Sequence, residues 1–186
     1  MYRLGDTMNR KKEWFIDIDY GAPVGTVMST ITEVFPQERD WTCSVACIRT
    51  LLSSVGVKED EDYFINNLNI IKGPQNSRDI KNWGLIYKDD SIIYGCDKPV
   101  SDDLAGDLTK LLQTHNVMVE CMLNYAHWLV ILSYIQLGSL EDDIIIFYDP
   151  YFNEVRQIRA DEFFSMWWDI GDKPLHRDYV AIRKGC

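Results

Sequence analysis

Residues 37–47 read QERDWTCSVAC, a polar loop that runs directly into an apolar segment. From Cys43 to Val55 the apolar residues recur every three or four positions, which predicts a helix that ends near Gly56. Cys43 is therefore expected in the first helical turn, where unpaired backbone N–H groups and the helix dipole stabilise a thiolate. Gln37, on the loop, carries a side-chain amide that can donate a hydrogen bond to a developing oxyanion. This run predicts a nucleophile and an oxyanion donor.

Two later motifs supply the other groups that a nucleophilic thiol requires. His127 opens the apolar run 128–132, which predicts a strand with the imidazole at its mouth. Asp149 follows the strand predicted over 144–148. If the two strands are neighbours, the carboxylate of Asp149 can orient the imidazole of His127, which takes the proton of the thiol.

Each of these residues also has an ordinary structural interpretation. A cysteine at a helix start is often a small buried apolar residue, and a histidine at a strand is often a hydrogen-bonded core side chain. An Asp-Pro pair after a strand is a common turn signal. The other histidines, His115 and His176, lie in polar surroundings and are weaker candidates. It is the order of the motifs along the chain that favours a thiol-dependent site.

Length, composition and charge restrict the class of protein. A chain of 186 residues with 46% hydrophobic residues is long and apolar enough for one domain with a full core. The formal net charge of −10 disfavours nucleic acid and an anionic membrane surface as partners. The start of the chain has no signal-peptide pattern, and no segment reaches the roughly 18 apolar residues of a transmembrane helix. We therefore expect a protein made in the cytoplasm, with non-classical export left open.

The cysteines and acidic residues predict no metal or cofactor site. Five cysteines, an odd number, fit free thiols better than a disulfide framework. Cys43 and Cys47 lie four positions apart on one predicted helix, but further ligands at zinc-site spacings are missing. The acidic cluster 59–62 is typical of a solvated helix start and lacks the calcium-loop pattern.

The order of predicted elements indicates an α+β domain, with helices first and antiparallel strands after them. The expected helices cover 43–55, 59–70, 78–83, 101–115 with Ser101 as N-cap, and 161–168. The expected strands cover 91–94, 117–123, 127–134, 144–148 and 179–183, with a further candidate at 14–20. We expect residues 1–33 to be an N-terminal extension and residues 34–186 to be the domain.

With these residues in place, the chain resembles the C39-like branch of the papain-like cysteine peptidases. Residues 34–183 carry the resemblance. That family's first motif is a glutamine, five residues, a cysteine, a glycine, any residue, an alanine and a cysteine. The matching residues are Gln37, Cys43, Ala46 and Cys47, then His127-Trp128 for the second motif and Tyr148-Asp149-Pro150 for the third.

The resemblance implies a papain-like fold in which the Cys43 helix packs on a C-terminal antiparallel sheet. It also implies a bacterial enzyme that hydrolyses a peptide or protein substrate through Cys43, His127 and Asp149. Gln37 would be the oxyanion donor. The family usually has aspartate and glycine where this chain has Thr42 and Ser44. Trp41, two positions before Cys43, is a point of similarity to the related guanylyl-cyclase-like proteins. Paired metal carboxylates, which would support nucleotide cyclisation, are not identifiable in the sequence.

The motifs leave alternatives to a peptidase open. The same thiol chemistry can deamidate a glutamine side chain. A papain-like domain that has lost turnover can serve as a binding or regulatory module, because a fold does not fix a function. Trp41, Trp128 and the Trp167–Trp168 pair are candidates for a cleft wall, and for the pair burial in the core is the alternative.

Overall fold

The computed structural model describes residues 23–68, 70–84, 92–98, 102–122, 126–167 and 177–185. The helices are α1 (Cys43–Ser53), α2 (Glu61–Asn67), α3 (Ser77–Asn82), α4 (Leu104–Thr114) and α5 (Ala160–Met166), with a 3-10 helix η1 (Gly95–Asp97). The strands are β1 (Gly25–Met28), β2 (Ile92–Tyr94), β3 (His115–Met122), β4 (Ala126–Gln136), β5 (Ile144–Asp149), β6 (Glu154–Arg159) and β7 (Tyr179–Arg183). Among the described helices, none has the length and apolar character needed to cross a membrane.

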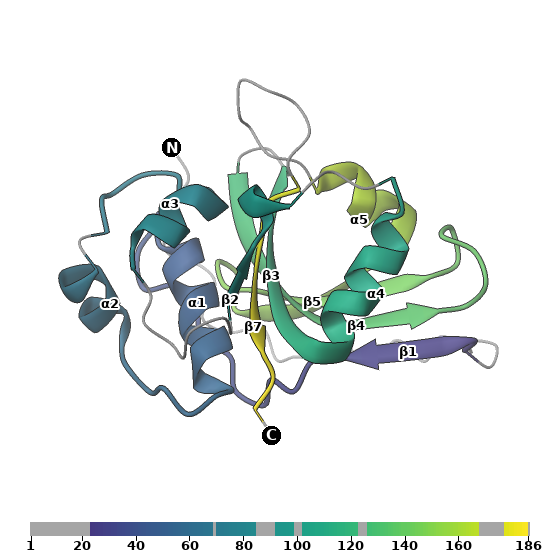
Figure 1. The fold of residues 1–186 in the computed structure, drawn as a ribbon, viewed down its shortest axis with the longest axis horizontal. Helices are drawn as coiled ribbons and strands as arrows, with labels where there is room; N and C mark the ends of the chain where they lie inside the picture. Colours follow the sequence, from purple (N-terminus) through teal and green to yellow (C-terminus); the bar gives the residue numbers. More distant parts are fainter. Residues whose placement is uncertain are drawn as a thin grey trace.

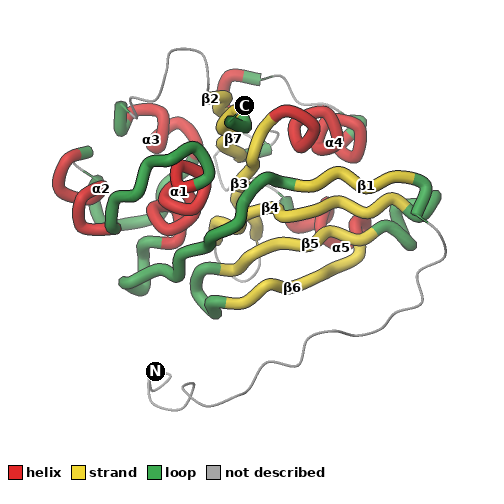
Figure 2. Tube along the Cα trace, turned by 90° about the horizontal axis from the view of Figure 1, so that it is seen from below, coloured by secondary structure: helices red, strands yellow, loops and turns green. Residues whose placement is uncertain are grey.

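The strands form one antiparallel sheet in the order β2-β7-β3-β4-β5-β6, with β1 added beside β4. Strand β4 is long enough to have two different neighbours on one side. Its first half pairs with β3, where Val130 lies opposite Met118, and its last residues pair with β1, where Gln136 lies opposite Gly25. Figure 2 shows β1, β4, β5 and β6 running side by side.

Helices cover both faces of the sheet (Figure 1). Successive residues of a strand point to opposite faces, and β3 follows this rule. Met118 packs into the cluster around α1, whereas Val117 and Val119 pack into the cluster around α4 and α5. The first helices therefore lie on one face and the later helices on the other, which is the α+β arrangement that the sequence predicts.

Helix α1 is fixed in place because it is buried on nearly all sides. Val45, Ile48 and Leu51 are completely buried. Burying one such side chain stabilises the fold by about 2 kcal/mol. The helix cannot shift without losing several of these contacts, so the position of Cys43 at its first residue is determined by the core.

Two helices begin later than the sequence predicts. The helix expected over 59–70 covers only Glu61–Asn67, because the carboxylate of Asp60 accepts a hydrogen bond from Tyr63 N at 2.7 Å and caps it there. Ser101 is outside the described residues. The cap of α4 is instead Asp103, whose side chain accepts from Gly106 N at 2.9 Å.

Two strands, β1 and β6, were not predicted, and the predicted strand over 14–20 lies outside the described residues. Strand β1 lies inside the segment 1–33 that we expected to be an extension. Its residues Gly25–Met28 are instead hydrogen-bonded to β4 and belong to the sheet. Strand β6 is the outer strand beyond β5.

Asn116 ties the segment after β1 to the core. Its Oδ1 accepts from Thr30 N at 2.8 Å, and its Nδ2 donates to Thr30 Oγ1 at 2.9 Å and to Ser54 Oγ at 2.8 Å. We expect Asn116→Ala to lower the free energy of unfolding by about 2 kcal/mol. The reason is that removing this completely buried side chain leaves its hydrogen-bond partners unpaired. Urea denaturation measures this, with exposed Asn67→Ala as the control. Equal losses in the two variants would contradict the prediction.

Candidate active site

Cys43 is the first residue of α1, and its free thiol is half-buried. The first helical bond on this turn runs from Ala46 N to Thr42 O at 2.9 Å. The N–H groups of Cys43 and Ser44 therefore have no acceptor within the helix and point out of its N-terminal end. The thiol lies where a negative charge on sulfur is favoured by these groups and by the helix dipole.

His127 and Asp149 meet because β4 and β5 are neighbours in the sheet. The distance from His127 Nε2 to Asp149 Oδ1 is 2.8 Å. The exposed fractions of the two side chains are 2% and 0%. Asp149 Oδ1 also accepts from Tyr151 N at 3.0 Å, and Asp149 Oδ2 lies 3.4 Å from Arg156 Nη1. The carboxylate of Asp149 thus has three partners, His127, Tyr151 N and Arg156, and it fixes the orientation of the imidazole.

The Cys43 side chain also interacts with the ring of His127. Burial by itself would lower the pKa of His127, but its interactions with Asp149 and Cys43, through hydrogen bonding and charge, raise it to about 9. Burial would raise the pKa of Asp149, yet the bond to His127 and its charge lower it. Near neutral pH the site therefore contains an imidazolium between a carboxylate and the thiol group.

The structure places Gln37 on the loop before α1, next to the turn that follows Asp149. Its backbone N–H donates to Pro150 O at 3.1 Å. Its side-chain Nε2 donates to Arg39 O at 2.7 Å, within its own loop. An amide nitrogen carries two hydrogens, so one of them remains for another acceptor. The loop is thus joined to the turn beside the His127–Asp149 pair.

An aromatic pair on the turn between β5 and β6 was not identified as part of the site. Tyr151 and Phe152 are 49% and 51% exposed. The ring of Tyr151 lies edge-on to that of His127, with 6.4 Å between the ring centroids. The guanidinium of Arg156 lies 5.4 Å from the Phe152 ring centroid. Two exposed aromatic residues directly after an Asp-Pro pair were the signal that the sequence offered.

The tryptophans have different positions from one another. Trp128 is buried on the α1 side of the sheet, and Trp41 is half-buried against the same cluster. Trp167 is buried on the opposite face, where it packs on Phe163 and Phe164. Of the two interpretations of the tryptophan pair, core and cleft wall, the structure shows the core for Trp167. Trp168 lies outside the described residues.

The structure also describes Cys47 and the acidic cluster 59–62, which the sequence analysis considered as possible metal ligands. Cys47 is completely buried, and burial, followed by the charges of Cys43 and Asp149, raises the pKa of its thiol. Within the described ranges, no three His, Cys, Asp or Glu side chains are grouped so that they could hold a metal ion. The acidic cluster 59–62 is not uniformly solvated as expected: Asp60 and Asp62 are exposed, but Glu61 is buried.

Comparison with known proteins supports the fold but assigns no family. No protein-family model matches the sequence, and no curated protein matches it. The structure is similar to the crystal structure of the peptidase domain of Streptococcus ComA, a bi-functional ABC transporter involved in a quorum-sensing pathway. The TM-score is 0.54 at 14% identity, covering 83% of this chain and 98% of that chain. The chain therefore has a mixed helix-and-sheet fold like that of a peptidase domain, consistent with the papain-like fold that the sequence motifs imply.

Proposed function

We propose that this chain is a cysteine hydrolase that cleaves amide bonds of a peptide or protein substrate. The observation that carries the proposal is the buried His127–Asp149 bond of 2.8 Å beside a half-exposed thiol, Cys43, at a helix start. A nucleophile, a base and a group that orients the base are the parts that nucleophilic amide hydrolysis needs.

The reaction follows from these roles. The Cys43 thiolate attacks the carbonyl carbon, and the carbonyl electrons move to oxygen, where the Cys43 N–H and the second amide hydrogen of Gln37 stabilise the charge. When the C–N bond breaks, the His127 imidazolium gives its proton to the departing amine. Neutral His127 then takes a proton from water, which attacks the thioester and releases the acid. The thiolate and imidazolium are restored together, while Asp149 keeps the ring oriented.

The exposed pair Tyr151 and Phe152 favours a substrate with an apolar side chain beside the scissile bond. The experiment for the reaction is to incubate wild type and Cys43→Ala with a defined mixture of peptides and to analyse the products by mass spectrometry. New termini that depend on Cys43 support a peptidase. Intact peptides in which glutamine has become glutamate support a deamidase instead. If neither product depends on Cys43, the proposed hydrolase is wrong.

A second candidate function, a non-catalytic binding module, is favoured by the position of the Gln37 amide. Its Nε2 already donates to Arg39 O at 2.7 Å, which lowers its availability for an oxyanion. A binding module would retain its partner in the Cys43→Ala variant and release no product. Measuring partner binding and product formation on the same pair of proteins separates the two functions.

Cys43 and Cys96 offer an internal comparison of thiol reactivity, because both thiols are free and half-buried. We expect iodoacetamide to alkylate Cys43 at least about tenfold faster than Cys96 at pH 7. The reason is that Cys43 lies at the start of α1 beside His127, which can take its proton, whereas Cys96 lies beside the carboxylate of Asp97. Mass spectrometry of the native protein over time measures both rates. Equal rates would count against an activated thiol.

A further inference from the structure

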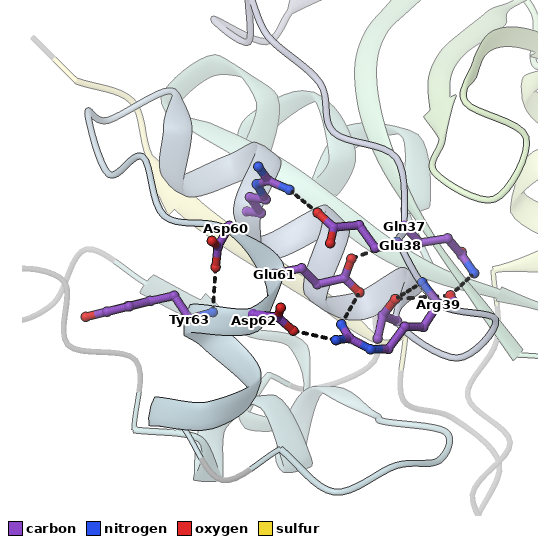
Figure 3. A network of polar contacts seen from close by, with 9 residues as sticks. Gln37, Glu38, Arg39, Asp60, Glu61, Asp62 and Tyr63 are labelled. Carbon is purple, nitrogen blue, oxygen red and sulfur yellow. Dashed lines mark hydrogen bonds and ion pairs between the residues drawn. The ribbon is translucent and has the colours of Figure 1, made fainter.

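Glu61 is a completely buried glutamate that the reaction steps above do not use. It is the first residue of α2, but it does not cap that helix, because Asp60 does so. Burial of a carboxylate without partners is costly, so its contacts indicate what the group does. Figure 3 shows the Glu61 side chain pointing toward the loop that carries Glu38 and Arg39.

Glu61 contacts the first residue of the short loop 38–42. Its Oε2 accepts from Glu38 N at 2.7 Å, and Glu38 directly follows Gln37. Thr42, the buried residue directly before Cys43, closes the other end of the loop. One buried carboxylate therefore holds the end of the loop that adjoins the oxyanion donor.

Charged side chains around the loop support the same arrangement. Arg39 Nη1 lies 3.9 Å from Glu61 Oε1, and a second nitrogen of Arg39 forms an ion pair with Asp62. Arg49, on α1, donates to Glu38 Oε1 at 2.9 Å. Figure 3 shows these bonds converging from α1, α2 and the loop. The loop is thus held against both helices, with Glu61 as its buried attachment.

The loop has little other support from secondary structure. Thr42 Oγ1 exchanges hydrogen bonds with the backbone of Arg39, at 3.1 Å each, which closes a turn inside the loop. These bonds set the shape of the turn but do not attach it to α2. Glu61 provides the buried attachment through its bond to Glu38 N, and Arg39 adds the ion pair with Asp62.

We propose that Glu61 is a positioning residue, whose carboxylate fixes the loop 38–42 and thereby the relative positions of Gln37 and Cys43. The inference rests on the proposed hydrolase, since it concerns how the oxyanion donor and the nucleophile are aligned. A displacement of about 1 Å at a reacting centre can lower a rate about a hundredfold.

The test compares Glu61→Ala with Asp62→Ala. Both remove a carboxylate next to Arg39, but Asp62 is exposed and has no bond to Glu38 among those described. We expect Glu61→Ala to lower kcat about 10- to 100-fold with KM changed less than about twofold. We also expect amide hydrogen exchange in residues 37–44 to increase at least about tenfold, with residues 62–68 unchanged. Asp62→Ala should stay within about twofold of wild type in each measurement.

Equal loop exchange in the two variants would overturn the role of Glu61. A loss of exchange protection spread equally over α2 would do so too, because it indicates a merely structural residue. If Glu61→Ala does not fold, Glu61→Leu fills the buried space but still lacks the acceptor for Glu38 N, and it should give the same loop-specific result. Hydrogen exchange needs no turnover, so an inactive wild type would refute the hydrolase while the exchange comparison still decides whether Glu61 fixes the loop.

Discussion

We expect the replacement of His127 with alanine to lower kcat/KM for amide hydrolysis about a thousandfold and to abolish the faster alkylation of Cys43 relative to Cys96. The first effect follows because general acid–base catalysis by a positioned histidine contributes roughly 10²- to 10⁴-fold. The second follows because the ring that interacts with the Cys43 side chain is removed. Peptide hydrolysis and iodoacetamide labelling, each at pH 7, measure the two effects on the same preparation.

His115→Ala is the matched control for this variant. His115 is also a buried histidine at the start of a strand, and its Nδ1 lies 2.7 Å from Thr114 Oγ1. Burial, with the charges of Arg183 and Lys184, lowers the pKa of His115, so it is neutral near pH 7. The control should lose stability but retain the labelling ratio of Cys43 to Cys96. If His127→Ala also retains that ratio, the pairing of His127 with Cys43 has no chemical effect.

The sequence predicted the residues that the sheet brings together, because each lies where a strong local pattern begins or ends. Cys43 opens a helix with buried residues at every turn. His127 lies at the second position of β4 and Asp149 at the last position of β5. Apolar periodicity locates such ends well. It does not give the neighbour of a strand, so the 2.8 Å contact between His127 and Asp149 required the fold.

Strands β1 and β6 were missed because neither carries a buried apolar pattern. The residues of β6 are half-exposed or exposed, and charged side chains are common on outer strands because they prevent pairing with other chains. Strand β1 has only four residues, and its pairing with the long strand β4 sets its position. Their positions depend on a neighbour that is distant in sequence, which local patterns do not contain.

Glu61 was misinterpreted for a related reason. Four consecutive acidic residues, 59–62, are usually solvated at a helix start, and three of them are exposed here. Glu61, however, shares the inward face of α2 with Phe64, three positions later, and both are buried. Helical spacing from the apolar Phe64 was the available signal that one of the four carboxylates points inward.

Replacing Asp149 with alanine is expected to lower the free energy of unfolding by about 3 kcal/mol at pH 6 and kcat/KM about a hundredfold. Removing one member of a buried ion pair leaves the other charge without compensation. Here the group left behind is His127, whose exposed fraction is 2%. Tyr151 N loses its acceptor as well, so the turn beside the site loosens. Urea denaturation and peptide hydrolysis measure the two losses.

The size of this stability loss depends on pH in a direction that the pKa shifts determine. The pKa of His127 is raised to about 9 from 6.5, so its stabilisation is complete below pH 6.5 and disappears as the pH rises through about 9. The pKa of Asp149 is lowered from 3.8, so its contribution is present above that value and disappears as the pH falls further. The difference between wild type and Asp149→Ala should therefore be largest between those two ordinary values and shrink above pH 9. The control is Asp142→Ala, at an exposed position where the described side-chain bond lost is the one from Ser139, and its stability loss should not depend on pH in this way. A stability loss for Asp149→Ala that stays constant with pH would mean that the His127–Asp149 pair is not ionised in the folded protein.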